Sequence, residues 1–259
     1  MNRSDSALSR AVDLFLFSGL CPAAVAAAFV AVCHEALFGG AAPMPWSAIT
    51  LAAAGTLVVY SIDRLRDLSE DGLSSPARTD FVRRNPTLLM TFCGLALGIS
   101  ALTAWQQPPL AWLFLALAFG LGMFHRRLKG HPTFGILYVA AAWVVVVVGL
   151  PALAGPPERV SLTSVAPVAL VLGVVIAANL VGSELREVEA DTPARTRLRT
   201  ARLLAIAALL IAPLAPGPLL PVAAFNLLAL LFFRSSERYG LGVLDGALLV
   251  GALVGLGLS

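Results

Sequence analysis

Charged residues are scarce in this chain of 259 residues: they make up 13% of it, whereas hydrophobic residues make up 58%. The mean hydropathy of +0.86 lies far above that of a soluble domain of this length. No polar block interrupts the apolar runs for long enough to fold separately. These features exclude a soluble globular protein and predict an integral membrane protein with one domain, residues 1–259.

Cysteine and histidine are also few, with three of each. Cys21, Cys33 and Cys93 lie in apolar segments without the paired spacing of metal ligands, so we expect small buried hydrophobes. His125 and His131 likewise lack a zinc-site spacing. The formal net charge of +3 is too small to indicate a nucleic-acid partner, and none is predicted.

Long apolar runs are abundant instead, and about 20 apolar residues cross a bilayer as a helix. The runs are rich in Leu, Ala and Val and do not alternate, which favours a helical bundle over a transmembrane β-barrel. Nine segments qualify, at residues 13–38, 46–65, 87–105, 108–125, 134–154, 164–184, 201–215, 217–234 and 241–258. The predicted fold class is all-α, a polytopic bundle of nine transmembrane helices surrounded by membrane lipids.

The positive charges predict the orientation of this bundle. With a cytoplasmic N-terminus, every Lys and Arg except Arg159 lies in an inside segment, as the positive-inside rule requires. The outer connections, such as "FGGAAPMP" and "QQPP", are short turns. We therefore expect the polar face and any active site to lie on the cytoplasmic side. No organelle-targeting feature stands out, so a bacterial inner membrane is the default location.

A first acidic cluster follows the second apolar segment. Asp63, Asp67 and Asp71 are spaced by four, so a continuing helix would place their carboxylates on one side. Two interpretations stay open. Arg64 and Arg66 can pair with these acids in an ordinary charged helix end, or the acids form a divalent cation site.

A second acidic cluster, Glu184, Glu187 and Asp191, follows the sixth segment with the same helical rhythm. In the predicted topology both clusters emerge on the cytoplasmic side and can face each other across a cavity. Mg²⁺ takes one or two protein carboxylates and completes its shell with waters and phosphate oxygens. Two acidic clusters above an apolar bundle therefore suit a diphosphate with a hydrocarbon tail.

Basic residues accompany both clusters. Each cluster precedes a copy of the tetrapeptide "PART", which carries Arg78 in the first copy and Arg195 in the second, as an internal duplication would produce. A third inside loop, "HRRLKGH", supplies Arg126, Arg127 and Lys129. These cations either anchor the topology or bind diphosphate oxygens as negative charge develops on the leaving group.

In these features the chain resembles the UbiA superfamily of intramembrane prenyltransferases. The family has nine transmembrane helices, Asp-rich motifs after the second and sixth helices, and a basic loop after the fourth. Its first motif reads Asn-Asp-x-x-Asp-x-x-x-Asp, and "VYSIDRLRD" matches the last two acids with Asp63 and Asp67. Val59 and Tyr60 stand where the family has Asn and Asp.

The family's second motif, similar to Arg-Asp-x-x-x-Asp, is matched by "REVEAD", with Glu187 and Asp191 as the acids. The stretch "FHRRLKGHPTFGILYVAAAW" is similar to the Tyr-x-x-x-Lys-Arg region that leads into the fifth helix. The resemblance covers nearly the whole chain. It implies Mg²⁺-dependent transfer of a prenyl group from a prenyl diphosphate to a small lipophilic acceptor, aromatic or quinoid.

The site residues implied by this resemblance and by the clusters fall into three sets. The expected catalytic acids are Asp63, Asp67, Asp71, Glu187 and Asp191. The expected metal ligands are Asp63, Asp67, Glu184, Glu187 and Asp191. The expected substrate-binding residues are Arg126, Arg127, Lys129, Arg78, Arg195, Asn179, Tyr60 and Tyr138.

Several alternatives remain. The same ionisation without an acceptor would make a membrane terpene cyclase, and a member without catalysis would bind lipids or assist assembly. Tyr60, Tyr138 and Trp143 can offer π-faces to an allylic cation, and Glu184 or Asp71 can take a proton. The isolated acids Glu35 and Asp245 are expected near helix ends and indicate no ion pathway.

Overall fold

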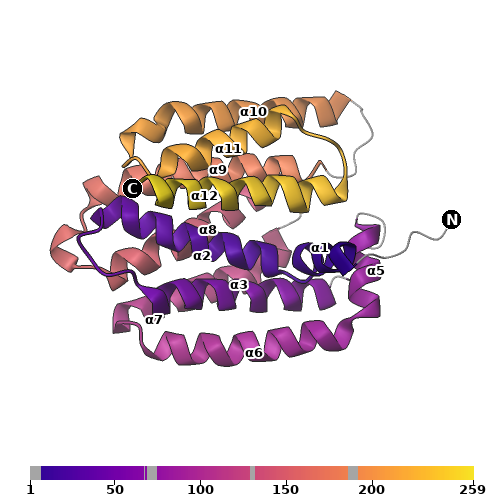
Figure 1. Cartoon of the computed structure of the whole chain (residues 1–259), viewed down its shortest axis with the longest axis horizontal. Coiled ribbons are helices and arrows are strands. Elements are labelled where there is room, and N and C mark those ends of the chain that lie inside the picture. Colours follow the sequence, from indigo (N-terminus) through magenta and orange to yellow (C-terminus); the bar gives the residue numbers. More distant parts are fainter. Residues whose placement is uncertain (1–6, 67, 69–74, 129–131, 186–191) are drawn as a thin grey trace.

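The computed structural model describes residues 7–66, 68, 75–128, 132–185 and 192–259. Within these ranges the chain forms eleven α-helices and no strand, which confirms the all-α class. Most helices lie side by side along one direction (Figure 1). They are α1 (Ala7–Phe17), α2 (Leu20–Phe38), α3 (Trp46–Arg66), α5 (Pro76–Arg84), α6 (Pro86–Trp105), α7 (Pro109–Leu128), α8 (Pro132–Ala154), α9 (Leu162–Ser183), α10 (Thr192–Ile211), α11 (Leu219–Leu231) and α12 (Asp245–Leu258).

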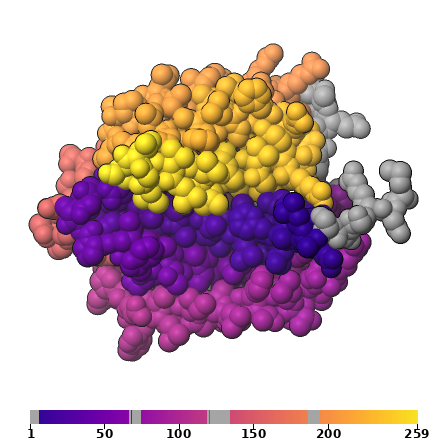
Figure 2. All heavy atoms as spheres, in the orientation of Figure 1, coloured from indigo at the N-terminus to yellow at the C-terminus, as the bar shows by residue number. Residues whose placement is uncertain are grey.

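Helix α2 lies at the centre of the bundle. It is apolar on all sides, rich in Ala and Val, and most of its residues are buried. The helices α3, α8, α9 and α12 all contact it, and its small side chains allow their close approach. Figure 2 shows how the N-terminal helices, in indigo, pack along the C-terminal helix α12, in yellow.

Six helical segments of the described chain are long and apolar enough to cross a membrane, and they are compatible with a multi-pass integral membrane protein. They are Leu20–Phe38, Trp46–Arg66, Pro86–Trp105, Phe134–Ala154, Leu162–Ser183 and Tyr239–Leu258. The other three predicted spans fall on α7, α10 and α11. The described side chains of α7, Pro109–Ala118, and helix α11, Leu219–Leu231, are apolar over fewer than 18 residues, and α10 begins with several arginines. The count of nine spans and the cytoplasmic N-terminus therefore stay predictions.

The first predicted span, residues 13–38, was wrong as one continuous helix. The chain breaks between α1 and α2 at Gly19, whose φ of 98° is in the left-handed region that favours glycine. A Cβ at this position would lie 3.2 Å from Cδ1 of Leu57 and 3.3 Å from Cβ of Tyr60. Both the turn and the tight packing against α3 thus require glycine, and α1 becomes a separate short helix at the end of the bundle.

Polar contacts tie the connections together at that same end. Ser235 donates to the carbonyl of Leu185 at 3.2 Å, and Arg202 donates to the carbonyls of Leu230 and Leu231, both at 3.0 Å. The short helix α5 runs across this end next to α1 (Figure 1). A π-helix, Tyr239–Leu244, leads directly into α12 and contacts α1. We call the end of the bundle that holds α1, α5 and this π-helix the charged end.

Candidate functional site

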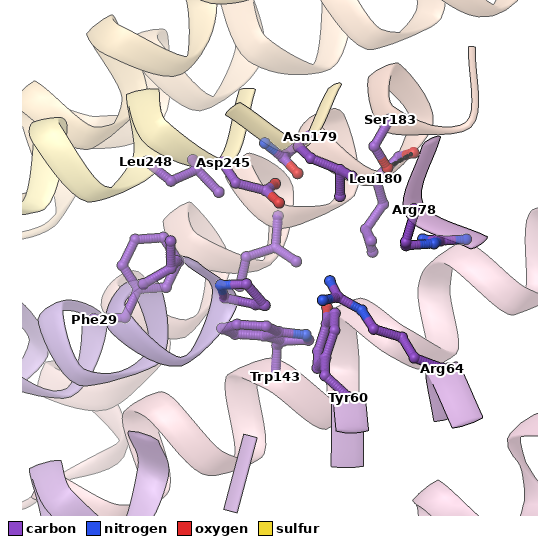
Figure 3. Close-up of a pocket in the computed structure, with 14 residues that line it drawn as sticks. Phe29, Tyr60, Arg64, Arg78, Trp143, Asn179, Leu180, Ser183, Asp245 and Leu248 are labelled. Atoms are coloured by element: carbon purple, nitrogen blue, oxygen red, sulfur yellow. Dashed lines mark hydrogen bonds between the residues drawn. The ribbon is translucent and has the colours of Figure 1, made fainter. Parts of the chain in front are cut away.

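A cavity of about 80 Å³ lies near the charged end, enclosed by α2, α3, α5, α8, α9 and α12 (Figure 3). Its wall combines apolar and polar side chains. Phe29, Trp143 and Leu248 are among the apolar ones. The polar ones are Tyr60, Arg64, Arg78, Asn179, Ser183 and Asp245.

Helix α3 contributes Tyr60 and Arg64, which are one turn apart and therefore share a face. The Arg64 Cζ lies 5.7 Å from the centroid of the Tyr60 ring, within the range of a cation–π interaction. Only 4% of Arg64 is exposed. Its guanidinium donates to the carbonyls of Phe17 and Leu16, the last residues of α1, so the buried cation satisfies a helix C-terminus.

Helix α9 contributes Asn179 and Ser183, again one turn apart. Asn179 is 5% exposed, and its Nδ2 has no hydrogen-bond partner among the described residues. Ser183 donates its hydroxyl to the carbonyl of Leu180 at 3.0 Å. A buried amide donor that lines a cavity without an acceptor is costly unless a ligand or water supplies one. Asn179 therefore leaves an amide donor on the cavity wall that the oxygen of a water or of a ligand would satisfy.

Helix α12 contributes Asp245, a half-buried acid in its first turn. The carboxylate points into the cavity from the side opposite Tyr60 and Arg64 (Figure 3). The π-helix immediately precedes it, and π-helical turns recur at functional sites. Sequence reasoning did not place Asp245 in the site. The available signal was its position as an isolated acid in an apolar span, which is by default a functional candidate.

Three of the predicted substrate-binding residues, Tyr60, Arg78 and Asn179, line this one cavity. Arg195, in the second copy of the tetrapeptide, is exposed near the start of α10. Tyr138 is half-buried on α8 and is not part of the cavity wall. Arg64 was predicted only as a partner of neighbouring acids, although its spacing of four from Tyr60 already predicts that both lie on one face of a helix.

The predicted acids are only partly described. Asp63 is exposed on α3, and Glu184 forms an ion pair with Arg197 at 3.7 Å near the surface. The other four, Asp67, Asp71, Glu187 and Asp191, lie outside the described residues, as does Lys129. Arg126 and Arg127 belong to the last turn of α7. Within the described part of the chain no three His, Cys, Asp or Glu residues come together as a metal site.

Residues that line the cavity lie close in sequence to both acidic clusters, which we also call the two acidic segments. Arg64 lies three residues before Asp67, and Ser183 lies four residues before Glu187. Both residues line the cavity from the last turn of their helices, α3 and α9. The two helices that lead into the acidic segments therefore end around the same cavity.

A second hollow lies beside the cavity, lined by Gly135, Ile136, Val139 and Glu184. It shares Leu180 and Ser183 with the cavity, so these two residues of α9 form the wall between them. The residues that α8 contributes to this hollow, Gly135, Ile136 and Val139, are apolar, whereas α9 contributes Ser183 and the following connection contributes Glu184.

The fold and the cavity together define an α-helical bundle compatible with a multi-pass membrane protein, with a cationic and amide-lined cavity near its charged end. Comparisons with protein-family models, with curated proteins and with solved structures give no match to this chain.

Proposed function

We propose that the protein is a divergent member of the UbiA superfamily, with one domain over residues 1–259. It would catalyse Mg²⁺-dependent transfer of a prenyl group from a prenyl diphosphate to an aromatic or quinoid acceptor within the membrane. The active site would face the cytoplasm, with a bacterial inner membrane as the location. Membrane lipids and the two substrates are the proposed partners.

One observation carries this proposal: the helix ends that precede both acidic segments converge on one cavity that holds buried donors. Arg64 and Ser183 are the cavity residues nearest to these segments in sequence. A diphosphate in this position would meet the buried cations and the amide donor of the cavity wall, and both acidic clusters follow directly from helices that line it. That arrangement suits ionisation of an allylic diphosphate, because negative charge grows on the leaving group.

The cavity residues have separate roles in this proposal. Arg64 and Arg78 supply charge-assisted hydrogen bonds to diphosphate oxygens, and Asn179 supplies its buried amide donor. Tyr60 and Trp143 present π-faces toward an allylic cation. The cavity is smaller than a prenyl diphosphate, so we place the hydrocarbon chain along the α8 side of the second hollow, which Gly135, Ile136 and Val139 line.

The chemistry of this donor set fits a diphosphate that arrives with Mg²⁺, because the wall has two cations and one unsatisfied amide. The residues that would hold the metal are Asp63, Asp67, Glu184, Glu187 and Asp191. When bound, Mg²⁺ neutralises charge on the departing diphosphate. Asp71 would assist within the same acidic segment, and the basic residues Arg126, Arg127, Lys129 and Arg195 would attract the substrate to this face.

In the proposed reaction the allylic C–O bond breaks and its electron pair leaves with the diphosphate. A ring carbon of the acceptor forms a new C–C bond to the prenyl carbon. The ring then loses the proton from that carbon. Asp245 is the carboxylate that lines the cavity in the described structure, and we assign it as the proton acceptor.

The experiment that tests the function is incubation of the purified protein with radiolabelled prenyl diphosphates of several lengths, Mg²⁺ and a panel of aromatic acceptors. The expected result is a prenylated acceptor, formed together with diphosphate. Release of diphosphate with a cyclised product, in the absence of an acceptor, would instead identify a terpene cyclase, and release with a hydrolysed product would identify hydrolytic chemistry. Binding of the prenyl diphosphate without turnover would identify a lipid-binding or assembly protein.

A further inference from the structure

Glu237 lies in the connection between α11 and α12, far from the acidic segments in sequence, yet its carboxylate contacts α5. The backbone N–H of Ala77 donates to Oε2 of Glu237 at 3.1 Å, and the backbone N–H of Arg78 donates to Oε1 at 2.9 Å. Pro76, the first residue of α5, has no N–H. Glu237 therefore accepts the first two amide donors of this helix with both of its oxygens, where the helix dipole also favours an anion.

Helix α5 needs such an attachment because it is short. It has nine residues, fewer than an isolated helix requires for stability in water. Its own residues Thr79 and Val82 are buried against the bundle, and the ring of Phe81 packs against that of Phe17 in α1, with centroids 5.9 Å apart. These apolar contacts hold the middle of α5, while the carboxylate of Glu237 holds its first turn.

That first turn carries Arg78, the residue through which α5 lines the cavity. The backbone N–H that donates to Glu237 belongs to Arg78 itself. Arg78 therefore connects the two: its backbone is held by Glu237, and the same residue lines the edge of the cavity (Figure 3).

We propose that Glu237 is a positioning residue, which holds the first turn of α5 so that the Arg78 guanidinium is pre-organised for an anionic ligand in the cavity. This inference rests on the proposed function, because the anion is taken to be the diphosphate. Glu237 does not contact the anion. By holding the backbone of Arg78, Glu237 lowers the conformational entropy that is lost when Arg78 is ordered by the bound anion.

The next residue provides a matched control. Arg238 donates from Nη2 to Oδ1 of Asp13 in α1 at 3.1 Å. It lies in the same connection and also ties it to the charged end, but it does not contact the α5 amides. Arg238→Ala therefore loosens the same segment without releasing the first turn of α5.

The first test is a double-mutant cycle measured by calorimetry, with Mg²⁺ and inorganic pyrophosphate as the probe. We expect Arg78→Ala to weaken binding about tenfold, because one charge-assisted contact to the anion is lost, and Glu237→Ala to weaken it by a similar factor, because Arg78 is no longer held in place. In the Arg78→Ala background, Glu237→Ala should have no further effect. Glu237→Gln keeps an oxygen acceptor and should restore part of the affinity, and Arg238→Ala should bind as the wild type does. An effect of Glu237→Ala that persists without Arg78 would overturn the inference.

The second test needs no ligand. Hydrogen–deuterium exchange of the peptide that covers residues 76–84 should be faster in Glu237→Ala than in the wild type, and unchanged in Arg238→Ala. Equal exchange in Glu237→Ala and the wild type would contradict the inference alone. A wild-type protein that binds no pyrophosphate would contradict the proposed function and the anion-binding part of this inference, even if α5 exchanges as expected.

Discussion

Arg64 lies over the ring of Tyr60, one turn earlier in α3, with its Cζ 5.7 Å from the ring centroid. The same guanidinium donates to the last carbonyls of α1, at Phe17 and Leu16. One buried cation thus joins α1 to α3 and also contributes to the cavity wall. Because the cation–π contact fixes the side chain between these two environments, Arg64 links the stability of the charged end to the chemistry of the cavity.

Replacement of Arg64 by Ala should therefore destabilise the protein. The carbonyls of Leu16 and Phe17 would lose their donor in a buried setting, which costs about 2 kcal/mol. Thermal unfolding in detergent would measure this as a lower midpoint. Arg66→Ala is the matched control, because Arg66 is exposed in the same turn of α3 and should leave the midpoint unchanged. Equal midpoints for both variants would argue against the assigned role of Arg64.

Asn179→Leu should have the opposite effect on stability, since Nδ2 of Asn179 has no hydrogen-bond partner among the described residues that the substitution would remove. We expect Asn179→Leu to keep or raise the thermal midpoint, because a buried unsatisfied donor is replaced by an apolar group. Binding of Mg²⁺-pyrophosphate, measured by calorimetry, should weaken about tenfold if this donor contacts the anion.

Asn226 offers the contrast for this experiment. It is fully buried between α11 and α9, and its Nδ2 donates to the carbonyl of Val175 at 3.2 Å. Asn226→Leu should lower the midpoint and leave pyrophosphate affinity as it was. If Asn179→Leu destabilises the protein without affecting binding, Asn179 is structural.

The helical class and most helix positions follow from the sequence, because long apolar runs in a membrane protein can satisfy their backbone only as helices. Tyr60, Arg78 and Asn179 were predictable for a related reason. They lie beside the two acidic segments, and helical spacing brings neighbouring turns to one face. The break at Gly19 was not predictable from hydropathy, because Gly19 lies within an apolar run and its φ depends on the packing of α3.

Tertiary packing explains what the sequence did not reveal. The two copies of "PART" are identical in sequence, yet Arg78 reaches the cavity while Arg195 is exposed. Helix α5 ends at Arg84 and crosses the end of the bundle, whereas α10 continues as one long helix. The two arginines therefore have different surroundings. Asp245 was visible as an isolated acid in an apolar span, but only tertiary packing brings it into the same cavity as residues of α3 and α9.

Asp245→Asn should separate binding from turnover. Removal of a negative charge from the wall should tighten pyrophosphate binding several-fold, because the carboxylate repels the anion. The rate of prenyl transfer should fall, by about a hundredfold if Asp245 takes the ring proton. Product formation at saturating substrate measures this rate. Glu35→Gln changes the other isolated acid, which lies in α2 outside the cavity wall, and should affect neither quantity. An Asp245→Asn variant with unchanged turnover would remove Asp245 from the mechanism.

The acids of the two segments decide whether the charged end binds a metal or is only solvated. If Asp67 and Asp191 hold Mg²⁺ from opposite sides of the cavity, either Asp67→Asn or Asp191→Asn should abolish the Mg²⁺-dependent part of pyrophosphate binding. Chelation of Mg²⁺ should reproduce this loss in the wild type and have no further effect on the variants. Asp80→Asn is the control, since Asp80 pairs with Arg84 at 3.9 Å on the exposed side of α5. In an ordinary charged helix end, all three substitutions would change pyrophosphate affinity equally little, and the affinity would not depend on Mg²⁺.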